Sequence, residues 1–566
     1  MKILTNHIGY ECAGAKQAVL QTATHFKFSQ VELVSATNFE VVKQLSILSS
    51  GAVDQWSLGH FHTVDFSDFQ TAGHYFLRCG NSQSHPFEIG NGLLMTHCFS
   101  DILHYFKGQR CGGIYDQHDK QAPVLGSDKV VDVSGGWYDA SGDLSKYFSH
   151  LSFANYMNPQ QIPMIVWNMF KGLDLLKGNE QFAKYSAVRL QEEAIFGADF
   201  LTRMLSTEGY FYMTVFDKWS KDPKQRDLCA YEKQSGDKTE SYQAAFRQGA
   251  GIAIASLAVA YRKPMGGAFS AEQYLTAAED AYWHLIDHNK SYCDNGEENI
   301  IDEYCALIAA VELYKSCADE KYLQQARSWA EKLMKRQQSD DLQNNFWSAN
   351  SDGSRPYFHG AEAGLPVIAL TQYLAIEQDS ELQSKTEQVI THALKFELAI
   401  SAEVFNPFCY PRQYVKGLDE AKRSAFFISH HNESGYWWQG ENARLGSLAT
   451  MVHLVKPFIK DKQLNTSLDV FAQSALNWIV GLNPYDMCML DGIGFNNPDY
   501  LPELGFFNAK GGVCNGITGG FDNELDIAFN PDGQKNDILQ NWRWGEQWIP
   551  HGGWFMLAIM AQFSTR

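Results

Sequence analysis

The sequence predicts a mainly α protein in which a small β-sandwich precedes a much larger helical domain. Three observations support this. The 566 residues are too many for one ordinary hydrophobic core. Residues 1 to about 90 carry short β-branched and aromatic runs separated by turn residues, and from residue 92 the apolar residues recur at helical spacing. We therefore expect two domains, residues 1–90 and residues 91–566.

The first domain contains runs that are typical of strands. They read KQAVLQT, QVELVS, HFHTVDFS and GHYFLRCG, and Gly, Asn and Ser residues separate them. Turn signals at intervals of roughly 8–12 residues are the pattern of a small β-sandwich. The run HPFEIGNG predicts a last strand followed by a glycine break.

The second domain contains about twelve segments with helical periodicity. In PMIVWNMFKGLDLL, for example, Ile165, Met169, Leu173 and Leu176 lie on one helix face, which we expect to be buried. Alanine-rich segments such as RQGAGIAIASLAVAY would let helices approach closely from two sides, which favours a layered or closed arrangement. The twelve segments lie near residues 92–107, 161–176, 182–204, 244–262, 270–288, 300–317, 320–337, 362–378, 381–400, 441–460, 466–481 and 552–563.

Composition and charge exclude several classes of partner. Hydrophobic residues make up 45% of the chain and charged residues 20%, so a substantial core can form. The formal charge of −19 argues against nucleic acid and against anionic membranes, which both require a basic surface. The aromatic content of 13% suits a protein that binds flat apolar faces such as sugar rings, although a large core also uses many aromatic residues.

The N-terminal residues and the cysteines predict a cytoplasmic protein. The start MKILTNHIGYE lacks the apolar run of a secretory signal, and no segment approaches the roughly 18 apolar residues that span a bilayer. The 11 cysteines are odd in number and show no CxxC spacing. We expect most of them to be buried, reduced thiols.

Long irregular stretches between the helices hold many of the Trp, His, Asp and Asn residues. Such loops are uncommon in a compact domain unless they serve a function, so we expect a helical scaffold whose loops build a cleft. These stretches are residues 108–160, 205–243, 338–361, 401–440 and 482–551.

The first of these loops contains GGWYDASGDLSKY, residues 135–147. Its glycines allow a close approach of a ligand, and Trp137 and Tyr138 offer stacking faces. If Asp139 and Asp143 face one cavity, each raises the proton affinity of the other, which can tune a general base. The alternative is that both aspartates are ordinary turn or helix N-cap residues.

The C-terminal segment NWRWGEQWIPHGGWF, residues 541–555, places Glu546 among tryptophans that include Trp544. A carboxyl group walled by indoles loses hydration and keeps its proton to higher pH, which suits a general acid. Alternatively, Glu546 is a first-turn acid that the helix dipole favours. An Asp pair with a separate Glu is the division of labour that glycoside hydrolysis needs.

A third motif is FFISHHNESGYWWQGENARLGSL, residues 426–448. Its residues Tyr436, Trp437, Trp438 and Glu441 would form an aromatic platform with a carboxylate that recognises the nonreducing sugar, through hydroxyls or an amine. The alternative is a Trp-rich helix-packing corner. The adjacent histidines of this segment do not suit a metal site, because neighbours in sequence seldom point to one ion.

The chain resembles glycoside hydrolase family 9 with an N-terminal immunoglobulin-like domain, over nearly its whole length. The resemblance lies in NHIGYECAGAKQAVL, YFKGQRCG, DVSGGWYDASGD, DEYCALIAAVELY, GLNP and the GEQ…GG region. It implies an (α/α)6 barrel catalytic domain, inversion at the anomeric carbon, Asp143 as the catalytic base, Asp139 as the second aspartate that holds the water, and Glu546 as the proton donor.

Three departures from the family pattern bear on function. The loop reads DASGD where the family usually has DAGD, which leaves open which aspartate is the base. The His-His-Arg element that family endoglucanases usually carry after the GxNP segment is missing, which argues against binding of a long glucan. Relatives can hold zinc through two Cys and two His, but here only Cys111 and His118 are visible in that stretch.

These observations favour an exo-acting inverting hydrolase of short β-1,4-linked oligosaccharides of glucose or glucosamine, with an oligosaccharide substrate as its partner. The first alternative is an endo-β-1,4-glucanase, and the second is a carbohydrate-binding protein that has lost catalysis. The proposed reaction requires no cofactor. A structural calcium or zinc ion and the oligomeric state stay open.

Overall fold

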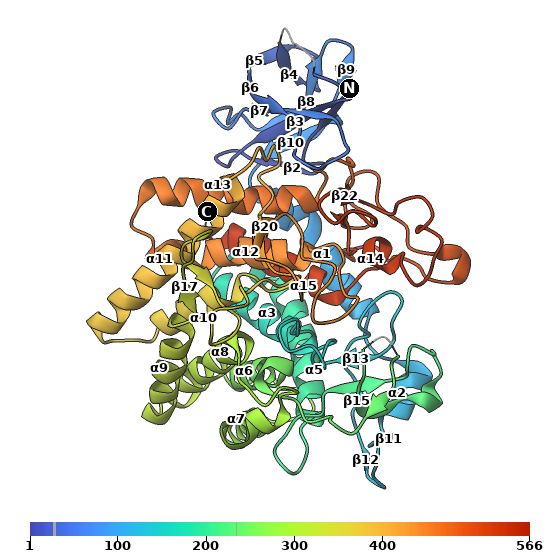
Figure 1. Cartoon of the computed structure of the whole chain (residues 1–566), viewed down its shortest axis with the longest axis vertical. Helices are drawn as coiled ribbons and strands as arrows, with labels where there is room; N and C mark the ends of the chain where they lie inside the picture. The colour runs from blue at the N-terminus through green and yellow to red at the C-terminus, as the bar shows by residue number, and fades with distance from the viewer. Residues whose placement is uncertain (26–29, 234, 566) are drawn as a thin grey trace.

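The computed structural model describes residues 1–25, 30–233 and 235–565. Its N-terminal part is a β-sandwich, which lies at one end of the molecule (Figure 1). One sheet has the order β1 (Lys2–Leu4), β3 (Gln17–Thr22), β7 (His60–Asp65), β6 (Ile47–Gly51). The other has the order β2 (Gly9–Glu11), β10 (Phe87–Gly90), β8 (Gly73–Cys79), β4 (Val31–Ser35), β5 (Val41–Leu45), with β9 (Ser82–Gln83) paired to β8.

Alternation along strand β3 explains how the sandwich packs on both of its sides. Ala18 and Leu20 belong to the core between the two sheets, whereas Val19 belongs to the core of the helical domain. Successive side chains of a strand point to opposite faces, so one sheet serves two cores. Trp56, from the loop after β6, extends this second contact by packing on Phe426 with ring centroids 4.9 Å apart.

The helical domain confirms the mainly α prediction, since each of the twelve predicted segments overlaps a helix. The helices are α1 (Leu93–Gly108), α3 (Ile162–Leu175), α5 (Ser186–Arg203), α6 (Ala250–Tyr261), α7 (Ala271–Tyr292), α8 (Ile300–Cys317), α9 (Glu320–Met334), α10 (Leu365–Leu374), α11 (Ser380–Ala402), α12 (Asn442–Val455), α13 (Lys462–Ile479) and α15 (Ile549–Ser564). Two short helices lie outside the predicted segments, α2 (Gly113–Asp119) and α14 (Trp542–Gly545), and the short helix α4 (Glu180–Ala183) overlaps the start of the segment 182–204.

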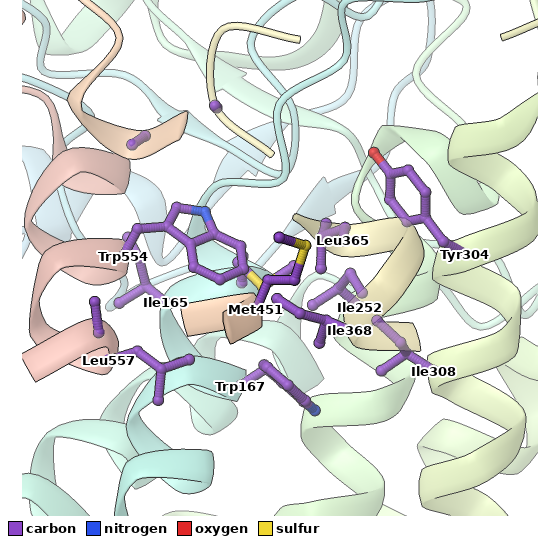
Figure 2. Close-up of a cluster of buried hydrophobic side chains, with 14 of the residues drawn as sticks. Ile165, Trp167, Ile252, Tyr304, Ile308, Leu365, Ile368, Met451, Trp554 and Leu557 are labelled. Atoms are coloured by element: carbon purple, nitrogen blue, oxygen red, sulfur yellow. The ribbon is translucent and has the colours of Figure 1, made fainter. Parts of the chain in front are cut away.

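Six of the described helices contact one another in a cyclic order. Helix α3 packs on α6, α6 on α8, α8 on α10, α10 on α12, α12 on α15, and α15 returns to α3. All six contribute to the buried cluster of Figure 2, for example through Ile165, Ile252, Ile308, Ile368 and Trp554. Helices α6, α10, α12 and α15 are buried along almost their whole length, and most of their residues are apolar or small.

The remaining long helices cover this inner group from outside. Helices α1, α5, α7, α9, α11 and α13 each contact at least one inner helix. Helix α9 shows the expected pattern, because Tyr322, Ala326, Trp329 and Leu333 are buried while the intervening polar residues face solvent. No helix among the described residues is long and apolar enough to cross a membrane.

Short sheets stiffen the loops between the helices. A four-stranded sheet has the order β13 (Lys146–Tyr147), β14 (Thr214–Phe216), β15 (Asp227–Tyr231), β16 (Lys238–Thr239), so the end of the loop at 135–147 is paired to β14. The two-stranded sheets are β11 (Ala122–Pro123) with β12 (Val130–Val131), β17 (Gln337–Gln338) with β18 (Phe346–Trp347), β19 (Gln413–Val415) with β20 (Arg423–Ala425), and β21 (Thr518–Gly519) with β22 (Ile527–Ala528).

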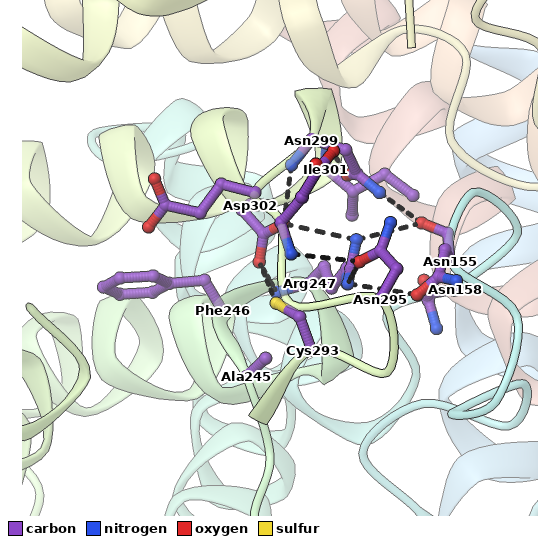
Figure 3. A network of polar contacts seen from close by, with 12 residues as sticks. Asn155, Asn158, Ala245, Phe246, Arg247, Cys293, Asn295, Asn299, Ile301 and Asp302 are labelled. Carbon is purple, nitrogen blue, oxygen red and sulfur yellow. Dashed lines mark hydrogen bonds and ion pairs between the residues drawn. The ribbon is translucent and has the colours of Figure 1, made fainter. Parts of the chain in front are cut away.

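A buried polar network holds the loop at 148–160 against the helices (Figure 3). The Arg247 guanidinium donates to Asn155 Oδ1 at 3.1 Å and to Asn295 Oδ1 at 2.8 Å. The Arg247 backbone N–H donates to Asp302 Oδ1 at 3.2 Å, and the Asn299 amide donates to the Asn155 carbonyl. Because a buried charge is costly without partners, this network fixes the loop relative to α6 and α8.

Strand β2 supplies the cap that joins the two domains. The buried carboxylate of Glu11 accepts from the Gly92 backbone N–H at 2.8 Å and from the Leu93 N–H at 3.0 Å. These are two of the otherwise unsatisfied amide groups at the start of α1, where a negative charge also suits the helix dipole.

We predict that Glu11→Gln lowers the free energy of unfolding by about 1–3 kcal/mol, because the neutral amide offers one oxygen to the two amide groups and removes the charge. Chemical denaturation of the full chain measures this. Glu192→Gln on the exposed face of α5 is the matched control, with an expected change within about 0.5 kcal/mol. Equal stability of the two variants would contradict the capping role.

Candidate active site

The loop at 135–147 folds into a tight turn that buries both aspartates. The Asp143 N–H donates to the Ala140 carbonyl at 3.3 Å and the Ala140 N–H donates to the Asp143 carbonyl at 3.2 Å. Asp139 is 3% exposed and Asp143 is 7% exposed. The preceding Gly135 and Gly136 have φ of 84° and 74°, the left-handed region that glycine adopts without strain.

A short strap joins this turn to the C-terminal segment. We use the name strap for residues 139–142 together with residues 546–549. The Ser141 N–H donates to the Gln547 carbonyl at 2.9 Å, and the Gln547 N–H donates to Ser141 Oγ at 3.0 Å. The Ile549 N–H donates to the Asp139 carbonyl at 3.1 Å, and Ala140 forms an antiparallel bridge with Trp548. The strap therefore holds the Asp pair beside the segment that carries Glu546.

The Gly142 backbone makes the closest link to Glu546. Its N–H donates to Glu546 Oε1 at 3.1 Å. A Cβ atom at position 142 would lie 2.4 Å from the same oxygen, so a residue with a side chain does not fit without displacing the carboxyl group. The extra residue of the DASGD loop, Ser141, makes two of the strap hydrogen bonds.

These side chains open into one cavity of about 590 Å³. This volume lies within the range of small-molecule sites, roughly 300–1,000 Å³. Five of the ten predicted site residues line it, namely Asp139, Asp143, Tyr436, Trp437 and Glu546. The other lining residues are Gly142, His150, Trp219, Lys221, Gln439, Tyr500, Phe506, Ile538, Leu539, Gln540, Trp542, Arg543 and Trp548.

The hydrogen bonds of the two aspartates differ. Asp143 Oδ1 accepts from the Ser145 N–H at 2.8 Å and its Oδ2 accepts from the Tyr147 hydroxyl at 2.7 Å. Burial raises the pKa of Asp143, but these hydrogen bonds and the charge of Arg226 oppose the shift. The negative charge of the pair is therefore best placed on Asp143.

Asp139 accepts its hydrogen bonds from two side chains. Its Oδ1 accepts from the Trp548 indole at 3.1 Å and from the Gln161 amide. Burial holds the pKa of Asp139 well above its usual range, and the charges of Asp143 and Glu546 raise it further. Two like charges this close do not both ionise readily, so a proton stays on Asp139 while Asp143 is charged.

Glu546 has the environment of a proton donor. Burial raises the pKa of Glu546 to about 8, and the negative charge of Asp143 raises it as well, while the Gly142 hydrogen bond acts in the opposite direction. The carboxyl group is thus protonated at neutral pH. A protonated Glu546 and a charged Asp143 that line one cavity can act as general acid and general base in one reaction.

Two tryptophans predicted to bind substrate lie outside this cavity. Trp137 is fully buried, its indole donates to Glu193 Oε1 at 2.8 Å, and it packs edge-on against Phe106. Trp544 is also fully buried and packs against Trp438. Both predictions are corrected to core positions, because the chain directs these side chains away from the carboxyl groups that neighbour them in sequence.

Tyr138 and Trp438 also lie outside the cavity. The Tyr138 hydroxyl accepts from the Gly112 N–H at 3.2 Å, which turns its ring toward α2. Trp438 stacks on His430 with ring centroids 3.5 Å apart, and the Arg543 guanidinium covers it at 4.0 Å. Both faces of the Trp438 indole are therefore occupied by protein, so Trp438 offers no free stacking face to a sugar.

Glu441 is a structural residue rather than a sugar-binding one. It is 1% exposed and forms an ion pair with Arg444 at 2.5 Å. It also accepts from the Gln413 amide at 2.9 Å and from the Ile428 N–H at 2.9 Å. With these partners it cannot pair with an amine of the substrate.

Several cavity residues were missed in the sequence analysis. Trp542 and Trp548 flank Glu546 in the quoted segment, so their position carried a signal. Trp219 and Lys221 come from the irregular stretch 205–243, which was expected to contribute to a cleft without any residue being chosen. Nothing in the local sequence marks Tyr500 or Phe506, because only the fold brings their segment to Glu546.

Cys111 and His118 do not fit a zinc site. Their nearest shared partner is Asp119, which lies 3.6 Å from Cys111 Sγ and 3.9 Å from His118 Nδ1. Asp119 already pairs with Lys146 at 2.7 Å and with Arg226 at 2.8 Å, and two cations repel a metal ion. Metal-ligand spacing also occurs among Asp139, Asp143 and His150, which belong to the cavity described above.

Comparisons with known proteins agree with this architecture. The sequence profile of the cellulase N-terminal Ig-like domain matches residues 1–84, and that of glycosyl hydrolase family 9 matches residues 96–503. A cellodextrinase of Butyrivibrio fibrisolvens is 29% identical over 158 residues, which are 26% of this chain and 27% of that protein. Endoglucanase C of Cellulomonas fimi is 31% identical over 176 residues, 26% of this chain and 16% of that protein.

Solved structures share the fold over the full length. A metagenome-derived glycoside hydrolase family 9 endoglucanase superposes with a TM-score of 0.69 at 17% identity, covering 100% of this chain and 99% of that chain. The structure of AaCel9A in complex with cellobiose-like isofagomine gives a TM-score of 0.64 at 15% identity, covering 100% of both chains. Because the family profile covers residues 96–503, well over half of the 566 residues, this protein belongs to glycosyl hydrolase family 9.

Proposed function

We propose that the protein hydrolyses short β-1,4-linked oligosaccharides of glucose or glucosamine with inversion, and that it removes one sugar at a time from the nonreducing end. The observation that carries this proposal is the compact cavity in which Glu546 faces the Asp139–Asp143 pair. The cyclic contacts of the six inner helices support the predicted (α/α)6 barrel as the scaffold of this cavity. A cytoplasmic location stays a prediction, which cell fractionation tests.

The proposed reaction uses three carboxyl groups in defined protonation states. A water molecule beside Asp143 attacks the anomeric carbon while Asp143 accepts its proton. The bond from that carbon to the glycosidic oxygen breaks, and Glu546 gives its proton to the leaving oxygen. The products are a free sugar of inverted configuration and the remaining saccharide, which carries a new hydroxyl group. Proton exchange with solvent then restores Asp143 and Glu546.

Asp139 has a positioning role in this scheme. Its Oδ1 is held by the Trp548 indole and the Gln161 amide, and its other oxygen lies 3.8 Å from His150 Nδ1. With a proton on its carboxyl group, Asp139 can hydrogen-bond the attacking water without competing for its proton. The burial of both aspartates keeps the water in a low-dielectric site, where this orientation has the greatest effect.

The sugar itself stays open between glucose and glucosamine. Glu441, which favoured glucosamine in the sequence, is buried against Arg444 and no longer supports that choice. The cavity holds three carboxyl groups, which suit an ammonium group, but also Lys221 and Arg543, which oppose one. The relatives named cellodextrinase and endoglucanase support a glucan, and the second name keeps endo action as the alternative.

We predict that the purified protein releases a single terminal sugar from cellopentaose or from its glucosamine counterpart, first as the α-anomer, because the bond cleaved is β and the configuration inverts. Proton NMR follows the anomer, and chromatography of early time points measures product sizes. A panel of cellobiose, chitobiose and the glucosamine disaccharide selects the sugar. Early release of mainly two- and three-sugar products would instead establish endo action.

We predict that Glu546→Gln lowers kcat/KM for the preferred disaccharide by about 10²–10⁴-fold, because the leaving sugar no longer receives a proton. The loss is expected to be smaller for a dinitrophenyl β-glycoside, whose leaving group needs little protonation. Glu192→Gln, on the exposed face of α5, serves as the control. Equal losses on both substrates would contradict the assignment of Glu546 as the acid.

We predict a bell-shaped dependence of kcat/KM on pH. Glu546 acts in its protonated form, so activity is present below its pKa of about 8 and is lost as pH rises through that value. Asp143 acts in its charged form, so activity is lost as pH falls through its pKa. Because this pKa is raised, the loss is expected at a higher pH than for an ordinary aspartate. Glu546→Gln should remove the alkaline limb, which steady-state rates across the folded pH range test. An unchanged alkaline limb in this variant would assign it to another group.

A further inference from the structure

The turn at Asp217–Lys221, which follows β14, has an unusual backbone. Lys218, Trp219 and Lys221 have φ of 59°, 56° and 58°, although none of them is glycine. Left-handed conformations of such residues cost free energy and persist only where the surroundings impose them, often at functional sites. Trp219 and Lys221 from this turn line the active-site cavity.

Asp217 imposes this conformation and ties the turn to the catalytic loop. Its buried carboxyl group accepts from the Lys221 N–H at 3.1 Å and from Ser145 Oγ at 3.2 Å. Ser145 is the residue whose N–H holds Asp143. From the other side, the Tyr115 hydroxyl donates to the Lys221 carbonyl at 2.8 Å. The start of the Lys221 side chain is thus fixed relative to Asp143.

A second segment of the cavity wall carries Phe506. This residue closes a tight turn with Leu501, since each donates its N–H to the carbonyl of the other at 3.1 and 3.2 Å. The Phe506 ring packs against Tyr500, which also lines the cavity, with centroids 5.4 Å apart. The two walls meet where Lys221 Nζ lies 3.6 Å from the centroid of the Phe506 ring.

We propose that this contact between Lys221 and Phe506 is a clasp that closes one end of the cavity and restricts hydrolysis to one sugar per cleavage. The inference rests on the proposed function and adds the residues that determine the length of the product. A cation over an aromatic face is a favourable contact between partly exposed groups, and it bridges segments that no helix or sheet joins directly. Without it, a longer chain can pass through the end of the cavity.

The test compares product sizes from one reaction mixture, so it does not depend on absolute rates. Phe506→Ala and Lys221→Asn each remove the clasp from one side, and Asn tolerates the left-handed backbone at position 221. With the pentasaccharide that the wild type cleaves, we expect the ratio of two- and three-sugar products to single sugar to rise at least several-fold in both variants.

The chain offers a matched control for each variant. Lys218→Asn changes an exposed lysine of the same turn, and Phe507→Ala removes the neighbouring ring, which is 65% exposed. Both controls should keep the wild-type product ratio. Phe506→Leu keeps an apolar side chain without the aromatic ring and replaces Phe506→Ala if thermal unfolding shows that the latter does not fold.

The outcomes separate the two proposals. If the wild type and all folded variants release single sugars in the same ratio, exo action stands and the clasp proposal is wrong. If the wild type itself releases mainly two- and three-sugar products or cleaves none of the pentasaccharides, the proposed function fails and the clasp proposal fails with it.

Discussion

The strap between residues 139–142 and 546–549 is the contact on which the site depends. It joins a loop near the start of the helical domain to the segment before the last helix, and its hydrogen bonds leave the Gly142 N–H free to hold Glu546. Ser141, the residue that lengthens the DASGD loop, contributes both its backbone N–H and its hydroxyl to the strap. Ser141 therefore helps to hold Glu546 beside the Asp139–Asp143 pair.

Burial then gives the three carboxyl groups different tasks. All of them lose hydration, but Asp143 alone combines a backbone N–H, a tyrosine hydroxyl and the nearby charge of Arg226. Burial raises the pKa of Asp139 and of Glu546, and the charge on Asp143 raises both further.

The aromatic residues show that proximity in sequence is a poor guide to the lining of a cavity. Trp137 neighbours the Asp pair and Trp544 neighbours Glu546, yet both indoles lie in the core, whereas Trp542 and Trp548 line the cavity. The parts of the cavity wall that we propose to determine product length come from two turns that are distant in sequence, Asp217–Lys221 and Leu501–Phe506. These turns meet where Lys221 lies over the Phe506 ring, the contact proposed to close one end of the cavity.

The sequence by itself determined the two-part layout, the twelve long helices and the three carboxyl groups, because periodicity and local motifs depend on neighbours along the chain. Tyr436 and Trp437, which were chosen from the sequence as substrate-binding residues, line the cavity. Only the tertiary structure decided that Glu441 pairs with Arg444, that Trp137 and Trp544 are core residues, and that Lys221 meets Phe506. The direction of a side chain in an irregular loop follows from contacts with segments hundreds of residues away, and no local pattern records them.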